Sequence, residues 1–420
     1  MTYKLFSYSS LQIITRYLNE VDRFLLSKNS QSFQTVDKSV PLRADSFEFF
    51  TQNEFKFGDN KYKFGIYRIL KGAPTPLVVQ MDNNNGGVPY DLDEFGIHDN
   101  SSEHLMTPGD ILNGSIDQIR SRRNTTEEDQ TFINTIYKEE SENKYLHGEI
   151  SISEHDEYVA SLKDNFFPYR FRRENLAHQY ECFIQLTIQT PNGVGIERVK
   201  YNRKLHEAVK NVSCKVFGKR TVQVNHLIIG NSGLIVRLPP DVKLQFKKLT
   251  IYGSITNIWK DLKATLVEPN RALGTLVIIS WHSKGEDLEH EVTRRAEKLV
   301  LLACLLHGKY LPYLRNLYNS YIRLISVEDF TVEDHVLLIQ EWIDSPRKIG
   351  NRFILQTGCE LRVDETFSLI RQKYNVPVYE DRSAVIPINS YLNLQVSQAP
   401  HQHYKDLFDL RMEVVRSQSF

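Results

Sequence analysis

The first hydrophobic pattern along the chain is helical. Leu11, Ile14 and Leu18 fall at positions i, i+3 and i+7, which places them on one stripe of a helix. Further apolar residues follow in short groups that polar residues interrupt. Residues 5–33 are therefore predicted to form two or three short helices, and residues 1–44 are predicted to be a small helical segment.

The pattern then changes to strict alternation, which is typical of half-buried strands. Apolar side chains recur at every second position on both sides of Gly58-Asp59-Asn60, at Phe55, Phe57, Tyr62, Phe64 and Ile66. A Gly-Asp-Asn cluster between two such runs is a hairpin signal. We therefore expect a β-meander over residues 45–70, within a meander and loop region that extends over residues 45–112.

Residues 113–165 are rich in charge and poor in apolar side chains. Thr125-x-x-Glu128 resembles a capping box, which would open a helix that runs through about Glu140. The span is predicted to be an exposed insertion, partly helical and partly disordered.

Strand signals return near residue 180. Residues 182–188 are predicted to form a strand, and residues 196–201 its partner after the turn Pro191-Asn192-Gly193. A helix is expected next, with Asn202 as its N-cap and Gly218 as its end. The apolar positions of this helix are Leu205, Ala208, Val209, Val212 and Val216.

A loose repeat begins after residue 220. Short apolar cores appear at 227–229, 249–251, 276–278, 299–301, 322–325 and 353–355. Helical patterns lie between several of them, at Trp259, Leu262 and Leu266, at Leu288, Val292 and Ala296, and at Val336, Ile339 and Trp342 with Thr331 as cap. With Leu324 as the fifth marker, the successive spacings are 22, 27, 23, 25 and 29 residues.

A strand-helix period of about 20–30 residues is typical of leucine-rich-type solenoids. The predicted fold class is α/β, with an α+β N-terminal part. It consists of a short helical N-terminus and a β-meander, followed by an irregular leucine-rich-repeat-like strand-helix solenoid over residues 166–420.

Composition narrows the class of protein. Aromatic residues make up 11% of the chain, which is enough bulky surface for a core and excludes global disorder. Lys plus Arg equals Asp plus Glu at 52 each, so there is no general attraction to nucleic acid or to anionic membranes. No secretion signal and no apolar run of about 20 residues is visible, so we expect an intracellular protein of the cytoplasm or nucleus.

The motifs of common catalytic and metal sites are absent or incomplete. Gly218-Lys219 and Gly308-Lys309 lack the remaining residues of a phosphate-binding loop. The pair His401-x-His403 has strand spacing but no third ligand nearby, and Asp91-x-Asp93-Glu94 lacks the rest of a Ca²⁺ loop. We therefore predict no catalytic residue, no cofactor and no metal site, and four buried cysteines without disulfides.

One basic cluster is mixed with aromatic residues. Arg170-x-Arg172-Arg173 alternates with Tyr169 and Phe171. Such mixtures suit nucleic acid or a peptide. The alternative is a strand with its aromatic rings inward and its arginines outward, and the neutral overall charge favours that alternative.

Three phrases of the sequence resemble a nematode-expanded family that carries a domain of unknown function. They are Gly86-Gly87-Val88-Pro89-Tyr90-Asp91-Leu92-Asp93, Tyr180-Glu181-Cys182-Phe183-Ile184-Gln185-Leu186-Thr187-Ile188 and Val199-Lys200-Tyr201-Asn202. The similarity covers roughly residues 5–300. It carries no chemistry that can be named from these residues.

Two weaker resemblances suggest a role. Residues 5–33 resemble a divergent F-box, a helical module that docks on the Skp1 adaptor of cullin-based ubiquitin ligases. The usual Leu-Pro opening is absent, because Phe6 follows Leu5, and the Trp of the third helix is missing. Residues 339–342, 353–355 and 409–414 resemble F-box-associated domains, which implies that the C-terminal region presents a target.

The leading hypothesis is a non-catalytic target-recognition subunit of such a ligase. Leu5, Leu11, Ile14 and Leu18 would contact the adaptor through an apolar helix face. The α/β region would bind a target protein whose identity the sequence does not give. The alternatives are a non-ligase scaffold of the same fold, with the N-terminal helices packed internally, and an unrecognised enzyme.

Overall fold

The computed structural model describes residues 8–18, 20–120, 126–279, 285–302, 311–325, 330–357, 360–400 and 408–417. The chain forms two compact units. The first unit comprises residues 1–42, 49–221 and 233–242, and the second comprises residues 43–48, 222–232 and 243–420. Among the described residues, no helix is long and apolar enough to cross a membrane.

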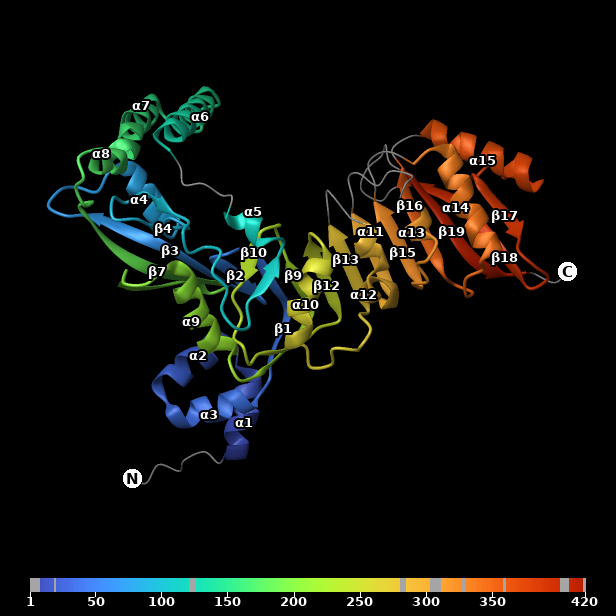
Figure 1. Cartoon of the computed structure of the whole chain (residues 1–420), viewed down its shortest axis with the longest axis horizontal. Coiled ribbons are helices and arrows are strands. Elements are labelled where there is room, and N and C mark those ends of the chain that lie inside the picture. The colour runs from blue at the N-terminus through green and yellow to red at the C-terminus, as the bar shows by residue number, and fades with distance from the viewer. Residues whose placement is uncertain are drawn as a thin grey trace. The chain divides into compact units, whose positions relative to one another are not determined.

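The first unit begins with three helices, as the helical pattern predicts (Figure 1). They are α1 (Tyr8–Tyr17), α2 (Glu20–Asn29) and α3 (Gln31–Ser39). The side chain of Ser30 accepts a hydrogen bond from the Phe33 amide, which caps α3. Phe33 and Val36 on α3 are buried, so α3 contributes apolar side chains to the interior of the three-helix group.

The predicted meander is confirmed. Its strands are β1 (Leu42–Thr51), β2 (Glu54–Phe57) and β3 (Asn60–Leu70), and Phe57 pairs with Asn60 across the turn. β7 (Tyr180–Thr190) and β8 (Gly193–Lys200) extend this sheet antiparallel, in the order β1-β2-β3-β7-β8. Both β7 and β8 correspond to predicted strands.

Aromatic side chains fill the core of the first unit. Phe55 stacks on Tyr62 with ring centroids 4.7 Å apart, and Phe217 lies 5.5 Å from Phe55 and 5.4 Å from Phe57. Phe217 comes from α9 (Leu205–Phe217), which packs against β3. The alternation of apolar residues in the meander therefore marks the face that α9 covers.

Two caps differ from the sequence prediction. The N-cap of α9 is Lys204 rather than Asn202, because the Glu207 carboxylate accepts from the Lys204 amide. The long helix α6 (Glu127–Leu146) starts at Thr126, which forms a capping box with Asp129. The expected cap Thr125 lies outside the described residues.

The span 113–165 is largely helical where it is described, with α5 (Ile116–Arg120), α6, α7 (Ile152–Ser161) and the 3₁₀ helix η1 (Leu162–Phe166). The Arg-aromatic cluster that follows forms the helix α8 (Phe167–Arg173), not the predicted strand. Pro168 is the reason, because its fixed φ suits the first turn of a helix. Tyr169 is buried on this helix, whereas Arg170 and Arg173 pair with Glu174 and Glu127.

The remaining elements of the first unit are α4 (Leu77–Asn84), β4 (Asp91–Leu92), β5 (His98–Asp99), β6 (Ile111–Asn113) and β10 (Leu234–Val236). Two glycines after α4 allow the chain to press against β3. Gly87 has φ +89°, and a Cβ there would lie 2.7 Å from the Ile66 carbonyl group. Ile66 and Val88 exchange two backbone hydrogen bonds at 2.9 and 3.1 Å. The glycines of the Gly86-Gly87-Val88 sequence are therefore explained by close packing of this backbone against β3.

The second unit contains the six short apolar cores that the sequence predicts after residue 220. Its six parallel strands are β9 (Thr221–Ile229), β12 (Lys248–Tyr252), β13 (Thr275–Ile279), β14 (Lys298–Leu302), β15 (Tyr321–Ile325) and β16 (Arg352–Thr357). The register places Leu227, Leu249, Leu276 and Leu299 side by side. All six predicted cores are confirmed as strands. Leu299 pairs with Ile322 rather than Leu324, so the fifth marker shifts by two residues.

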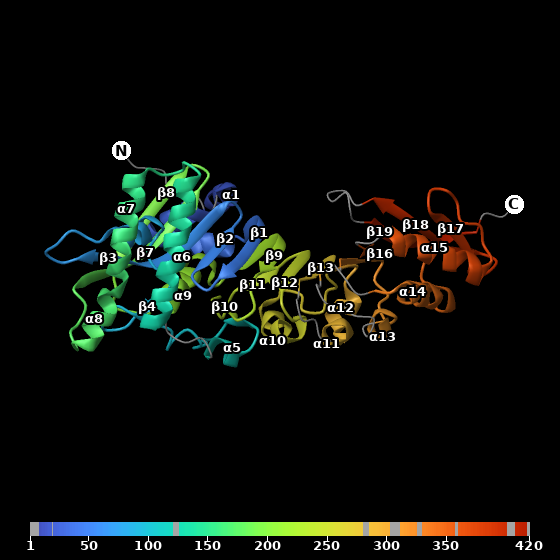
Figure 2. The same ribbon diagram turned by 90° about the horizontal axis from the view of Figure 1, so that it is seen from above.

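Helices cover one face of these strands, as Figure 2 shows for α10 to α13. The helices are α10 (Ile255–Thr265), α11 (Gly285–Glu289), α12 (Glu291–Arg295), α13 (Leu311–Leu314) and α14 (Val332–Asp344). The predicted cap Thr331 forms a capping box with Asp334 at the start of α14. Of the predicted helix at Leu288, Val292 and Ala296, Leu288 lies on α11 and Val292 on α12, and Ala296 is the C-cap of α12.

An antiparallel group follows the parallel strands. β19 (Phe408–Arg416) pairs with β16 and with β18 (Leu392–Pro400), and β17 (Ser383–Pro387) forms the edge. β11 (Lys243–Gln245) pairs with β9, and α15 (Glu360–Tyr374) lies beside α14 and β17. The described structure is therefore mixed α/β with a large mixed sheet.

The buried His335 gives the second unit a pH-dependent stability. Its Nδ1 lies 2.9 Å from Thr366 Oγ1, and burial lowers its pKa from 6.5 to about 4. The folded state favours the neutral ring, so its contribution is complete above pH 6.5 and is lost as pH falls toward 4. We expect roughly 3 kcal/mol less stability near pH 4 from this group.

Urea unfolding at pH 7 and pH 5, followed by tryptophan fluorescence, measures this dependence. His335→Gln should lose less stability than the wild type between the two pH values. An equal loss in both chains would assign the pH dependence to other groups.

Candidate protein-binding surfaces

A buried ionic network fixes α2 and α3 to the rest of the first unit. Arg23 on α2 donates from Nε to Asp37 Oδ1 at 2.5 Å, and Arg220 donates to Asp37 Oδ2 at 2.7 Å. All three side chains are 3% exposed or less. Arg23 also donates to the carbonyl oxygens of residues 37, 40 and 41. Asp37 therefore joins α2 and α3 to the residues just after α9.

A second contact links α2 to the meander. Asn60 donates from its side chain to Glu20 Oε1 at 2.5 Å, in a buried position at the start of β3. Burial raises the pKa of Glu20, and the hydrogen bond from Asn60 opposes this rise. With the Asp37 network, this contact holds α2 in one orientation.

The residues of the predicted apolar stripe on α1 differ in their exposure to solvent. Leu11 and Leu18 are half-buried beside the buried Thr15, whereas Ile14 is 39% exposed. Ile13 and Tyr17, which lie off the predicted stripe, are 55% and 86% exposed. The fourth candidate, Leu5, lies outside the described residues. We call Ile13, Ile14 and Tyr17 the outer face of α1.

The outer face of α1 is the main feature that sequence reasoning missed. Ile13 and Tyr17 are four residues apart, so they form a second helical stripe next to the first. Nothing local distinguishes the two stripes, because contacts with α3 decide which one is covered. On α2, Leu25 and Leu26 are also exposed, at 43% and 44%. Each of the first two helices therefore presents apolar side chains to solvent.

The other broad surface is the sheet face of the second unit on which no described helix lies, which we call the helix-free face. We define it by one row of paired residues that point away from the helices: Thr250, Val277, Val300, Arg323, Ile354 and Arg411. Val300, Arg323 and Arg411 are half-buried, and the others are buried. Both arginines approach the buried Asp409: Arg323 Nη2 lies 3.4 Å from its Oδ1, and Arg411 Nη2 lies 3.5 Å from its Oδ2. Two guanidinium groups share one carboxylate there, which leaves an excess of positive charge.

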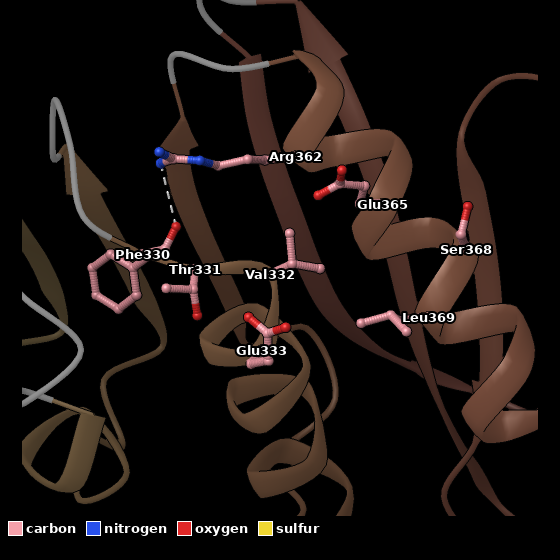
Figure 3. A pocket seen from close by; sticks show the side chains of 8 residues that line it. All are labelled: Phe330, Thr331, Val332, Glu333, Arg362, Glu365, Ser368 and Leu369. Carbon is pink, nitrogen blue, oxygen red and sulfur yellow. Dashed lines mark hydrogen bonds between the residues drawn. The ribbon is translucent and has the colours of Figure 1, made fainter.

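A groove lies between α14 and α15 of the second unit (Figure 3). It has a volume of about 720 Å³. Arg362 reaches across it and donates to the Phe330 carbonyl oxygen at 3.4 Å. Glu333 and Glu365 contribute carboxylates, and Val332 and Leu369 contribute apolar surface. The described part of the lining includes no histidine or cysteine, so these residues offer a mixed binding surface rather than a nucleophile with a base.

The candidate metal motifs have structural partners. Asp91 accepts from the Tyr201 hydroxyl at 2.9 Å and from the Leu205 amide at 2.8 Å. Asp93 accepts from the amides of Phe95 and Ile97. Across the described residues, no group of three or more His, Cys, Asp or Glu side chains is placed to hold a metal ion. The pair His401-x-His403 lies outside those residues.

The two described cysteines, Cys182 and Cys214, are free and half-buried rather than fully buried as predicted, and their partial burial changes the pKa of each thiol. Burial raises the pKa of Cys182 to about 11 and also raises the pKa of Cys214. A raised pKa keeps a thiol protonated and unreactive at neutral pH. Cys304 and Cys359 lie outside the described residues.

A comparison with protein families finds one match. Residues 204–358 match a family described as a domain of unknown function (DUF3557). The matched range runs from the cap of α9 through β16, so it includes all six parallel strands. It covers less than half of the chain, and it differs from the expected range of roughly 5–300. No curated protein and no solved structure matches the chain.

Proposed function

We propose that this chain is a non-catalytic recognition protein that joins a partner at its N-terminal helices to a target protein at its second unit. The partner on the helical side would be a Skp1-type adaptor, as the F-box resemblance of residues 5–33 suggests. The target would be presented by the region that resembles F-box-associated domains. The chain would then act as a target-recognition subunit of a ubiquitin ligase.

The outer face of α1 is the observation that supports this proposal most. Three large apolar side chains, 39% to 86% exposed, lie on one side of a single helix. An amphipathic helix with such a face suits docking into an apolar groove of a partner. The Asp37 network holds α2 and α3 in place, and α1 packs against α3, so binding would not require the helices to order first.

The second unit supports the target-binding part. Its parallel strands recur in register, and the described helices that accompany them lie on one face, which leaves the face that we call helix-free. We propose that the successive strands and helices of the second unit form a short leucine-rich-repeat-like solenoid. Proteins of that kind bind their partners on the face that corresponds to this helix-free face. Arg323 and Arg411 would favour an acidic side chain of the target near Asp409.

The alternative is a scaffold in which the helices serve only the first unit. The buried Asp37 network and the Glu20 contact favour it, because both would stabilise the unit without a partner. Adaptor binding distinguishes the two functions.

Isothermal titration with a purified Skp1-type adaptor tests the proposal. The double variant Ile13→Asp with Tyr17→Asp should weaken binding at least tenfold, because it places two charges in an apolar contact. Arg16→Asp is the matched control, since Arg16 is exposed on the same helix outside the outer face. It should change affinity by less than about threefold. A wild-type chain that fails to bind would exclude the adaptor role and leave the scaffold.

A further inference from the structure

Strand β8 is a sheet edge that no other described strand covers. All eight residues from Gly193 to Lys200 are exposed, and β8 ends the order of its sheet beyond β7. Val194, Ile196 and Val199 are 62%, 53% and 56% exposed. Sheet edges with this much apolar surface are usually shortened, covered or broken by proline.

The outward backbone groups of β8 can be assigned. The Tyr201 amide donates to the Cys182 carbonyl on β7 at 3.0 Å. Because N–H and C=O groups alternate sides along an antiparallel strand, residues 194, 196, 198 and 200 direct theirs away from β7. Four residues therefore present a row of backbone donors and acceptors with no strand beside them among the described residues.

A groove of about 660 Å³ lies on the α9 side of this edge. Its floor is apolar and consists of Phe64, Ile184, Leu186 and Val199. α9 forms one wall through Ala208 and Val212, and α2 and α3 form the other. An edge strand beside an apolar groove supplies both parts of strand-addition recognition, namely backbone pairing and a place for alternate side chains.

The rim of the groove is basic. Lys200, Arg203 and Lys215 line it and are exposed, and Glu197 is the one acidic residue among the described residues of the lining. Among the described residues, Lys200 and Lys215 have no ion pair. An occupant with acidic side chains would gain from these charges, and a basic occupant would be disfavoured.

We propose that β8 binds an extended segment of a partner protein, which adds as a further antiparallel or parallel strand. The segment would carry aliphatic residues that meet the groove floor on one face, and Val194 and Ile196 on the other, with acidic residues near the basic rim. This site is separate from the outer face of α1, and the proposal does not rest on adaptor binding.

Selection from a displayed library of random short peptides on the immobilised full chain tests the site. We expect enriched peptides that combine aliphatic and acidic residues. Ile196→Pro should weaken them about tenfold, because it removes one outward N–H and leaves the β7 ladder intact. Ile196→Thr keeps that N–H and should bind the peptides more tightly than Ile196→Pro.

Charge reversal provides the second readout. Lys200→Glu with Lys215→Glu should weaken the selected peptides several-fold, with a loss that shrinks at high salt. Lys138→Glu, an exposed change on α6, is the matched control. Unfolding curves of each variant show whether the fold is intact.

Three results would overturn the proposal. One is a selection that enriches no peptide, and another is peptides whose affinity survives Ile196→Pro. The third is self-association of the wild-type chain that Ile196→Pro abolishes, since a second copy would then occupy the edge.

Discussion

Replacing Asp37 with alanine is expected to lower the free energy of unfolding of the first unit by roughly 3–5 kcal/mol. The change would leave the Arg23 and Arg220 guanidinium groups buried without their carboxylate. Burial already lowers the pKa of Arg23, which shows that its environment disfavours the charge, and Asp37 opposes that effect. A buried charge that has lost its partner costs more than the pair itself contributes.

Urea unfolding followed by circular dichroism measures this effect. Asp37→Asn keeps some hydrogen bonds and should fall between the wild type and Asp37→Ala. Glu142→Ala, an exposed change on α6, should stay within about 0.5 kcal/mol of the wild type. A loss below about 1 kcal/mol for Asp37→Ala would mean that water reaches the two arginines.

Gly87→Ala is the second change with a large expected effect. It should lower the free energy of unfolding of the first unit by roughly 3–5 kcal/mol. Part of the loss arises from the positive φ of +89°, which costs an L-residue about 1–2 kcal/mol. The rest arises from contact, because the new Cβ would lie 2.7 Å from Ile66 and 2.9 Å from Gly65, both at backbone atoms. Backbone atoms in a paired strand have little room to move.

Gly72→Ala is a matched control for this second change. Gly72 has φ +74°, and a Cβ there would have nothing within 4 Å. It should therefore show the cost of the backbone conformation alone, about 1–2 kcal/mol. Equal losses at Gly72 and Gly87 would show that the close approach to β3 contributes nothing.

Periodicity predicted most of the elements, because burial on one side produces it directly. The alternation at Phe55, Phe57 and Tyr62 marks the face under α9, and the aliphatic cores from Leu227 onward mark strands with helices on one face. The register of β15 was not predictable. Ile322 and Leu324 are both aliphatic, and only the pairing with β14 distinguishes them.

The surfaces were predicted less well than the fold. The sequence indicated that α1 is amphipathic and predicted adaptor contacts at Leu11, Ile14 and Leu18. Of these only Ile14 is exposed, and Ile13 and Tyr17 are more exposed than Ile14. Asp37 and Arg220 are far apart in the chain, so no local pattern links them. The exposure of β8 also depends on the order of strands, which alternation does not give.

The position of β19 between β16 and β18 affects how the protein is made. Residues 352–357 emerge from the ribosome well before residues 408–416, their antiparallel neighbours. At typical synthesis rates the interval is several seconds. During that time the free side of β16 has no strand beside it and can pair with other nascent chains, so slow translation of this stretch should increase aggregation.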